Sequence, residues 1–381
     1  MALQDELYIG LMSGTGVDGI DVAVVDFTGS NPKLVCSRLH SISTDLKKRI
    51  SEISVVKEIT DKNTDTLELA AELDILMGEV FAEAVNQLLH NSEIDKKQIK
   101  AIGSHGQTIR HRPYGRTPFS LQIGDPNTIA HKTGITTVAD FRRMDVAAGG
   151  QGAPLTPAFH NAIFRSEKEN RIILNLGGIA NITVLDKRLE LPVIGFDTGT
   201  ANTLLDAWYN NQHPNSKVDY DKDAHFASEG KINQSLLKRL LDDPYFRLPF
   251  PKSTGREYFS MDWLNKNLQQ MERKIKPQDI QRTTLQLTVD TIVDAINQLS
   301  MDNYQLLVCG GGMHNPLIMQ LLSELLNKPV IKTDAIGVSG DYLEAMTFAW
   351  LARQRILKLT GNLPSVTGAT EEKILGAVYT A

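Results

Sequence analysis

Three glycine-rich turns, each directly after an apolar stretch, are the parts of this sequence best suited to chemistry. They read SGTGVDG (13–19), NLGGIAN (175–181) and CGGGMHN (309–315). Glycine lets a ligand approach the backbone closely, and successive N–H groups in such turns form concavities that bind anions. One such turn is weak evidence, but three of them predict a nucleotide held by its phosphates. The residues expected to contact it are Ser13, Gly14, Thr15, Gly16, Val17, Asp18, Gly19 and Ile20, then Asn175, Gly177 and Gly178, and finally Gly310, Gly311, Gly312 and Asn315.

Other nucleotide-binding patterns do not fit. No G-x-x-x-x-G-K-[ST] motif occurs, and the run Gly310–Gly312 lacks the third glycine of a dinucleotide fingerprint. The sequence therefore favours two hairpins that bind phosphates and a third turn that packs beside the adenosine.

Two aspartates lie in or near these turns. Asp18 would repel a phosphate unless a cation lay between them, so it is the candidate Mg²⁺ ligand, with a turn-stabilising aspartate as the alternative. Asp197 follows the apolar stretch 192–196 and is expected at a strand end, where it could act as a general base. The alternative for Asp197 is an Asx turn before a helix that begins at Asn202.

Further polar residues suit a sugar. His105 follows an expected strand, 99–103, and could contact the sugar or simply make structural hydrogen bonds. Gln107 and Thr108 could bind sugar hydroxyls. Arg142 and Arg143 could hold a carboxylate or phosphate through paired hydrogen bonds, or form ion pairs.

The elements that would position these residues alternate between strands and helices. Strands are expected at 8–12, 20–27, 33–41 and 99–103, and a helix at 67–89. The stretch 171–186 repeats the strand–turn–strand pattern of the N-terminus, and helices are expected at 202–210, 231–241, 283–298, 315–326 and 341–359 around a strand at 304–309. This pattern predicts an α/β protein with two related lobes and a ligand cleft between them.

Composition excludes several classes of protein. The chain has 381 residues, a net charge of -5 and 41% hydrophobic residues, which is typical of a soluble globular protein and not of a nucleic-acid-binding surface. Its two cysteines form no disulfide framework or metal-ligand set. Neither a signal peptide nor a membrane helix is recognisable, so we expect a cytoplasmic protein.

Motifs spread over nearly the whole chain resemble one family within the superfamily of sugar kinases, heat-shock chaperones and actin. The family is that of the anhydro-N-acetylmuramic acid kinases of bacterial cell-wall recycling. The matching motifs are GLMSGTGVDGID, GSHGQTIRH, QIGDP, VADFRRMDVAAGGQGAPL, NLGGIANIT, GFDTGTAN, PKSTGRE, VCGGGMHN and EAMTFAWLA.

The resemblance implies a two-lobed actin-like ATPase fold of mixed sheets flanked by helices. The expected lobes are 1–140 with 345–381, and 141–344. It also implies an enzyme that uses MgATP and water to open the 1,6-anhydro ring and phosphorylate O6, giving N-acetylmuramate 6-phosphate. Asp197 matches the family's catalytic aspartate, and the expected assembly is a homodimer. The resemblance makes Glu344 a sugar contact, whereas by pattern alone it could be a first-turn charge that complements the helix dipole.

One position departs from the family pattern, and two other functions stay open. The family usually reads MSGTS where this chain has Gly16, so a hydroxyl is lost beside the phosphates. The alternatives are a plain hexose or amino-sugar kinase of the same fold, and a nucleotide-driven binding protein.

Overall fold

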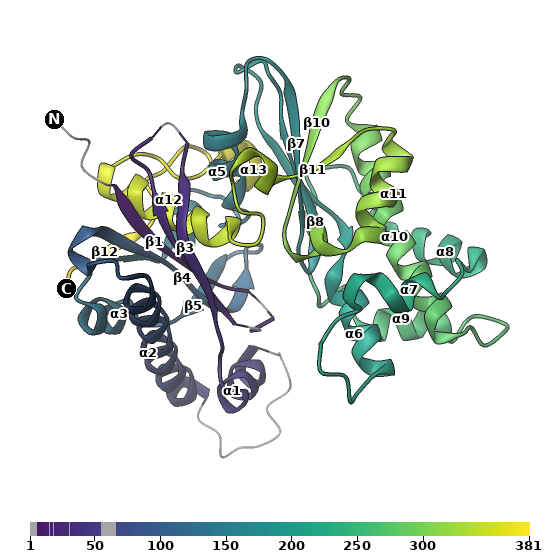
Figure 1. Cartoon of the computed structure of the whole chain (residues 1–381), viewed down its shortest axis with the longest axis horizontal. Helices are drawn as coiled ribbons and strands as arrows, with labels where there is room; N and C mark the ends of the chain where they lie inside the picture. The colour runs from purple at the N-terminus through teal and green to yellow at the C-terminus, as the bar shows by residue number, and fades with distance from the viewer. Residues whose placement is uncertain (1–5, 15, 18, 30, 55–65) are drawn as a thin grey trace. The chain divides into compact units, whose positions relative to one another are not determined.

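The computed structural model describes residues 6–14, 16–17, 19–29, 31–54 and 66–381. They form two compact units (Figure 1), one from the two chain ends, up to Ile163 and from Tyr342, and one from Phe164–Asp341. The boundaries predicted from the sequence were 140/141 and 344/345. Helix α5 (Thr156–Phe164) belongs mainly to the first unit, where Phe159 packs on Trp350 with ring centroids 5.9 Å apart.

The first unit contains a mixed sheet of seven strands in the order β12-β6-β4-β1-β2-β3, with β5 beside β4. Strands β1, β2 and β3 pair antiparallel, whereas β4 runs parallel to β1 and β6 parallel to β4. The strands are β1 (Leu7–Ser13), β2 (Ile20–Asp26), β3 (Lys33–His40), β4 (Ile99–Arg112), β5 (Phe119–Ile123), β6 (Thr137–Ala139) and β12 (Ala377–Tyr379).

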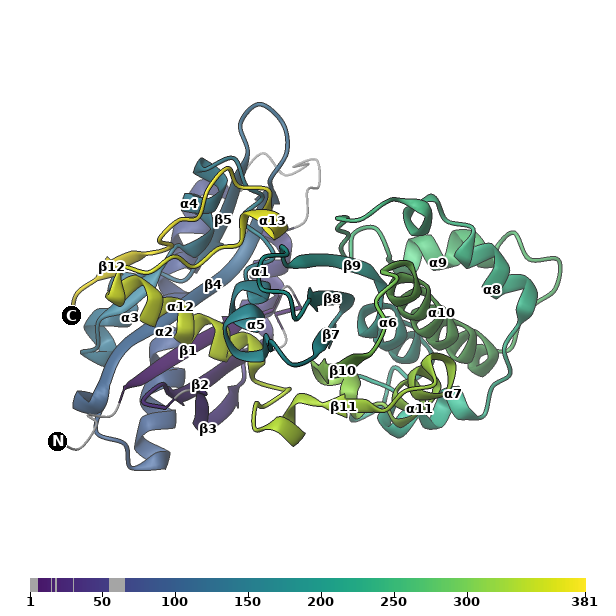
Figure 2. The same ribbon diagram turned by 90° about the horizontal axis from the view of Figure 1, so that it is seen from above.

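Helices cover this sheet. Helices α2 and α3 lie side by side, and α12 runs along β1 and β4 (Figures 1 and 2). The approach of α12 is close, because a side chain on Gly10 or Gly103 would collide with the backbone of Ala345 or Phe348. The helices of the first unit, besides α5, are α1 (Thr44–Ser54), α2 (Thr66–Ser92), α3 (Pro126–Thr133), α4 (Phe141–Ala147), α12 (Leu343–Leu357) and α13 (Pro364–Thr367).

The second unit repeats this topology. Its sheet has the order β11-β10-β7-β8-β9, with three antiparallel strands followed by two parallel ones. The strands are β7 (Asn170–Leu176), β8 (Ile179–Leu185), β9 (Ile194–Thr200), β10 (Tyr304–Cys309) and β11 (Val330–Lys332). The two mixed sheets flanked by helices confirm the predicted α/β class.

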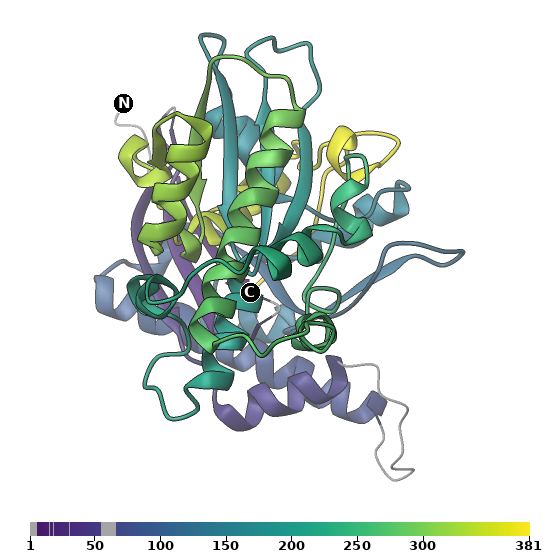
Figure 3. The same cartoon turned by 90° about the vertical axis from the view of Figure 1, so that its right-hand side faces the viewer.

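Apolar faces of two helices cover the second sheet. Figure 3 shows the green α10 in front of the teal strands of this sheet, and Ile292 of α10 and Ile318 of α11 belong to one buried core with Leu174 and Val308. The helices are α6 (Asn202–Gln212), α7 (His225–Ser228), α8 (Gln234–Leu241), α9 (Met261–Leu268), α10 (Pro277–Gln298) and α11 (Pro316–Leu326). Short 3₁₀ turns are η1 (Lys96–Gln98) in the first unit and, in the second, η2 (Lys222–Ala224), η3 (Pro244–Arg247), η4 (Gly311–His314) and η5 (Thr333–Ile336).

Two predicted strand ends are wrong. Strand β4 continues to Arg112, so His105 lies inside it, and β9 continues to Thr200, so Asp197 lies inside it. In both cases the polar residues still have a neighbouring strand to pair with. Strand β5 pairs with the second half of β4, and β8 pairs with all of β9 except Thr198. Within the described parts of the chain, we find no helix with the length and hydrophobicity of a membrane span.

Candidate active site

Asp197 lies on β9, the edge strand of the second sheet. A β-bulge falls beside it, because Asn181 pairs with Asp197 while the preceding Ala180 pairs with Gly199. Bulges of this kind change the direction in which a neighbouring side chain points. The open edge of the strand is covered by a loop, residues 243–257, which we call the Asp197 loop.

The Asp197 loop binds the aspartate at three atoms. The Asp197 N–H donates to the carbonyl of Lys252 (2.9 Å), and the hydroxyl of Tyr245 donates to the Asp197 carbonyl (2.8 Å). The backbone N–H of Thr254 donates to the carboxylate oxygen Oδ2 (2.9 Å). One loop therefore fixes both the main chain and the carboxylate.

The surroundings of Asp197 raise its pKa. Burial disfavours the charged form and, with the negative charge of Glu257, outweighs the Thr254 hydrogen bond, so the pKa rises from 3.8 to about 7. The side chain keeps some exposure to solvent. A carboxyl group with this pKa is matched to accepting a proton near neutral pH.

The second and third glycine turns meet in this unit. The carbonyls of Gly177 and Gly178 accept hydrogen bonds from the first residues of α6, with Asn202 N–H to Gly177 at 3.1 Å and Ala201 N–H to Gly178 at 3.0 Å. A side chain on Gly310 would collide with Asn175 and Leu176. Glycine is therefore required where the turn after β10 passes the end of β7.

Asn315 has a role in the helix that follows the third turn. It is the N-cap of α11, and its side chain accepts a hydrogen bond from the Ile318 N–H (3.0 Å). This contact stabilises the first turn of the helix.

In the first unit, the first glycine turn follows β1. The Ser13 hydroxyl lies 2.7 Å from Oε1 of Gln107 and 3.1 Å from the carbonyl oxygen of Gly19. Val17 has a left-handed backbone with φ of 56°, a strained conformation for a β-branched residue that is often found in ligand-binding loops. Thr15 and Asp18, the latter being the predicted metal ligand, lie outside the described residues.

Three of the predicted sugar-binding residues form one cluster. The Arg142 guanidinium donates from Nε and Nη2 to Nε2 of His105 (3.1 and 2.7 Å) and from Nη1 to the carbonyl of Gly152 (2.7 Å). Burial lowers the pKa of Arg142 to about 10, and the opposing charges of Glu344 and Asp145 favour its charged form. The side chain is thus a cation held in a fixed orientation.

His105 is neutral in this cluster. Burial and the Arg142 charge hold its pKa well below the usual 6.5, and Nε2 accepts the Arg142 hydrogen bonds, so the ring carries its proton on Nδ1. His105 therefore orients Arg142 and is not suited to exchange protons at neutral pH.

Two other predicted residues of this unit, Thr108 and Arg143, form contacts outside the cluster. The Thr108 hydroxyl accepts a hydrogen bond from Gln122 (3.0 Å), and Arg143 is exposed and pairs with Asp140 at 3.4 Å.

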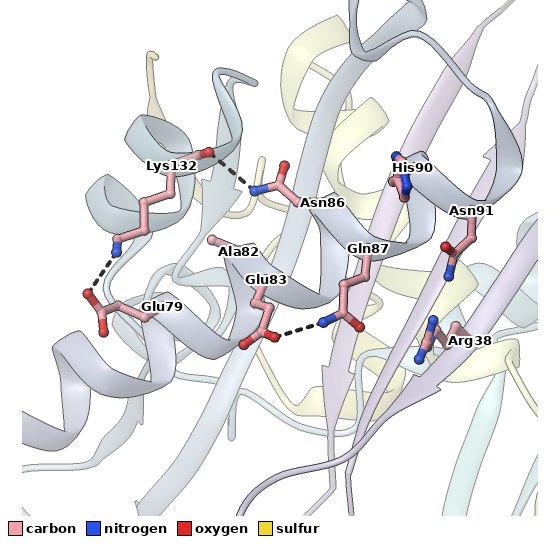
Figure 4. A pocket seen from close by; sticks show the side chains of 9 residues that line it. All are labelled: Arg38, Glu79, Ala82, Glu83, Asn86, Gln87, His90, Asn91 and Lys132. Atoms are coloured by element: carbon pink, nitrogen blue, oxygen red, sulfur yellow. Dashed lines mark hydrogen bonds and ion pairs between the residues drawn. The ribbon is translucent and has the colours of Figure 1, made fainter.

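A shallow groove runs along α2 (Figure 4), with a volume of about 670 Å³. Within it, Lys132 forms an ion pair with Glu79 at 2.8 Å, and the Gln87 amide donates a hydrogen bond to Glu83 at 2.7 Å. None of the predicted site residues lines it. The lining residues are Arg38, Glu79, Ala82, Glu83, Asn86, Gln87, His90, Asn91 and Lys132.

Comparison with known proteins identifies the family. The family model "Anhydro-N-acetylmuramic acid kinase" matches residues 6–381. Proteins named anhydro-N-acetylmuramic acid kinase from Coxiella burnetii and Xylella fastidiosa are each 50% identical to this chain, over 98% of it and over 97% and 96% of their own lengths. The chain belongs to this family. The kinase from Pasteurella multocida is 48% identical over 98% of the chain and 96% of its own length.

The Asp197 loop is the part of the site that the sequence did not predict. Tyr245, Lys252 and Thr254 reach Asp197 from a segment with no periodic pattern. The only signal for it was PKSTGRE, one of the motifs shared with the anhydro-N-acetylmuramic acid kinases, which gave the segment no role.

Proposed function

We propose that this chain uses ATP and water to open the 1,6-anhydro bridge of anhydro-N-acetylmuramic acid and to phosphorylate O6. The observation that carries this proposal is the Asp197 carboxyl group, held by the Thr254 N–H and given a pKa of about 7, in a member of this kinase family.

In the proposed reaction, Asp197 takes a proton from water as the water oxygen bonds to the anomeric carbon. The bond between that carbon and O6 breaks, and O6 accepts the γ-phosphoryl group, so the products are N-acetylmuramate 6-phosphate and ADP. Ordinary glycosidases place an acid on the leaving oxygen. Because phosphorus captures O6 here, one base is sufficient.

The glycine turns are proposed to bind the nucleotide. Ser13–Ile20 in the first unit and Asn175–Gly178 in the second would present backbone N–H groups to the phosphates, while Gly310–Gly312 would pack against the adenosine. The meeting of the second and third turns beside Asn175 supports their assignment to one ligand.

Magnesium is the expected companion of ATP, and it would neutralise charge on the phosphates. Mg²⁺ usually takes one or two carboxylates together with phosphate oxygens and water. Asp18 stays our candidate ligand from the sequence. Among the described residues, no group of three His, Cys, Asp or Glu side chains could hold a metal ion.

Arg142 is proposed to bind the lactyl carboxylate of the sugar. Its orientation by His105 and Gly152 supports this role, because a preoriented guanidinium loses less entropy on binding a carboxylate. Glu344, Gln107 and Thr108 are the proposed partners of sugar hydroxyl and amide groups.

One experiment tests the proposed function. The protein is incubated with MgATP and one of three additions: 1,6-anhydro-N-acetylmuramic acid, N-acetylmuramic acid, or no sugar. We expect phosphorylation of the anhydro sugar alone. Equal use of both sugars would indicate a plain amino-sugar kinase, and ATP hydrolysis that is indifferent to sugar would indicate a nucleotide-driven binding protein.

The resemblance to the family also supports a homodimer, and the need for ATP supports a cytoplasmic location. Sedimentation equilibrium of the purified protein tests the dimer. A sedimenting mass equal to the 42.2 kDa chain would contradict it.

A further inference from the structure

The Asp197 loop does more than cover the edge of a sheet. An edge strand presents backbone N–H and C=O groups with no neighbouring strand to bind them. At Asp197 both groups are bound, the N–H by the Lys252 carbonyl and the C=O by the Tyr245 hydroxyl. A phenol side chain thus takes the place that a backbone N–H of a sixth strand would fill.

The Tyr245 ring is itself firmly held. It is buried and packs edge-on against Phe259, with ring centroids 5.4 Å apart. The Lys252 ammonium lies 4.8 Å from the centre of the Tyr245 ring and donates to the carbonyls of Tyr245 and Phe246 (3.2 and 3.3 Å). The hydroxyl therefore has little freedom to leave the Asp197 carbonyl.

We propose that Tyr245 is a positioning residue for the reaction proposed above, whose hydroxyl fixes the main chain of Asp197 so that the carboxylate stays on the Thr254 N–H. This inference rests on the proposed function. Such a residue is needed because of the bulge beside Asp197, where the next residue, Thr198, has no partner in the β8–β9 register. Small displacements of a base from its substrate cost large factors in rate.

The test replaces one phenol and keeps the ring. Tyr245→Phe removes the hydroxyl alone, and Tyr258→Phe is the matched control, since Tyr258 contacts the same rings but donates to Asp243 (2.8 Å). We expect Tyr245→Phe to lower kcat with the anhydro sugar by about 10- to 100-fold and to leave the KM for ATP within about twofold. Tyr258→Phe is expected to keep kcat within about twofold.

A second readout separates positioning from general weakening of the fold. Without the hydroxyl, the carboxylate is no longer held on the Thr254 N–H, a hydrogen bond that lowers its pKa, so the pKa of Asp197 should rise above about 7. The acid limb of the pH profile of kcat should therefore move to higher pH in Tyr245→Phe and stay in place in Tyr258→Phe. A structural role alone would lower the melting temperature without moving that limb.

Lys252→Met is the second variant, and it decides the question if Tyr245→Phe does not fold. It removes the two amine hydrogen bonds that hold the η3 carbonyls, so we expect a smaller loss of kcat with the same shift of the acid limb. The proposal is overturned if the folded variants match Tyr258→Phe in both kcat and pH profile.

Failure of the proposed function gives a different result. In that case the unmutated protein does not phosphorylate the anhydro sugar. The positioning role is then read from the ¹³C chemical shift of the Asp197 carboxyl group during a pH titration, which needs no turnover. An unchanged titration in Tyr245→Phe would refute the role.

Discussion

At the scale of the single residue, the surroundings of Asp197 change both the stability of its charged form and its affinity for a proton. Partial removal from water makes its charge unfavourable, and the same effect keeps its affinity for a proton near neutral pH. The Thr254 N–H limits the shift by stabilising the charged form. The balance leaves a carboxylate that can both take a proton and release it.

The first prediction concerns pH. Because the base must be ionised, kcat/KM for the anhydro sugar should rise with pH through about 7, the pKa of Asp197, and level off above it. Asp197→Asn should fold and bind ATP but reduce turnover by more than a thousandfold, by order of magnitude. Steady-state kinetics from pH 5 to pH 9 check both statements, and turnover within tenfold of the unmutated enzyme would contradict the role of Asp197.

The second prediction concerns stability. The folded pKa of about 7 lies above the ordinary 3.8, so ionised Asp197 destabilises the fold: the penalty is absent below pH 3.8, grows up to pH 7 and is constant above it. Asp197→Asn should therefore raise the free energy of unfolding at pH 8 by about 2–4 kcal/mol.

Urea unfolding at pH 4 and pH 8 measures this difference. At pH 4 the variant and the unmutated protein should have nearly the same stability. Equal stability at pH 8 as well would show that the carboxylate is not desolvated.

The third prediction contrasts two neighbouring arginines. Arg142 is fixed by His105 and Gly152, whereas Arg143 is exposed. Lysine cannot reproduce the guanidinium fork, so Arg142→Lys should raise the KM for the anhydro sugar by about 10-fold or more, with the KM for ATP unchanged. Arg143→Lys should leave both constants within about twofold, and equal effects in both variants would reject the assignment of the sugar carboxylate to Arg142.

At the scale of elements, the apolar strands and the long helices could be predicted from the sequence because their periodicity comes from burial. The strand 20–27 and the helix 67–89 agree with β2 and α2. Polar runs such as SHGQT concealed the rest of β4, because what keeps them in a strand is pairing with β1 and β5, which the local sequence does not encode.

Most residues of the candidate site could also be proposed from the sequence, because glycine-rich turns and aspartates beside apolar stretches can be recognised in the sequence itself. The role of Tyr245 could not, because its hydroxyl binds a backbone carbonyl on a strand 48 positions earlier in the chain. A hydrogen bond of this kind places no requirement on the residue type at its acceptor, so it leaves no pattern there.

The fourth prediction concerns the contact of α12 with the first sheet. In Gly10→Ala the new methyl group would collide with the Ala345 carbonyl. Because backbone atoms cannot move aside cheaply, we expect a loss of about 3 kcal/mol or more. Gly29→Ala is the control, with its nearest neighbour 3.7 Å away, and chemical denaturation should show it close to the unmutated protein; similar losses in both variants would mean that α12 does not pack this closely.

At the scale of the whole molecule, the two units differ in how the chain builds them. The second is one continuous segment, whereas the first needs both chain ends. Buried Asp145 shows this dependence, because Asn362 and Thr367 near the C-terminus each donate to its oxygen Oδ1 at 2.7 Å. Helix α12 and strand β12 complete the same unit.

The fifth prediction follows from this difference. The fragment 164–341 contains all five strands of its sheet and its own core, so we expect it to fold alone and to unfold cooperatively. The fragment 1–163 lacks α12 and β12, and we expect it to fold only when the segment 342–381 is added. Circular dichroism and thermal unfolding of the fragments check this, and a cooperative transition of 1–163 by itself would contradict it.

The division of the first unit between the chain ends also sets an order of events during synthesis. On the ribosome, domains generally fold as they emerge, beginning with the first. Here the segment up to Ile163 is translated first but completes its unit only with the segment from Tyr342. The middle segment, Phe164–Asp341, therefore completes its core earlier. The N-terminal sheet, with the face that α12 will cover, stays open until the segment 342–381 has been translated, and that interval is when a chaperone would have most to bind.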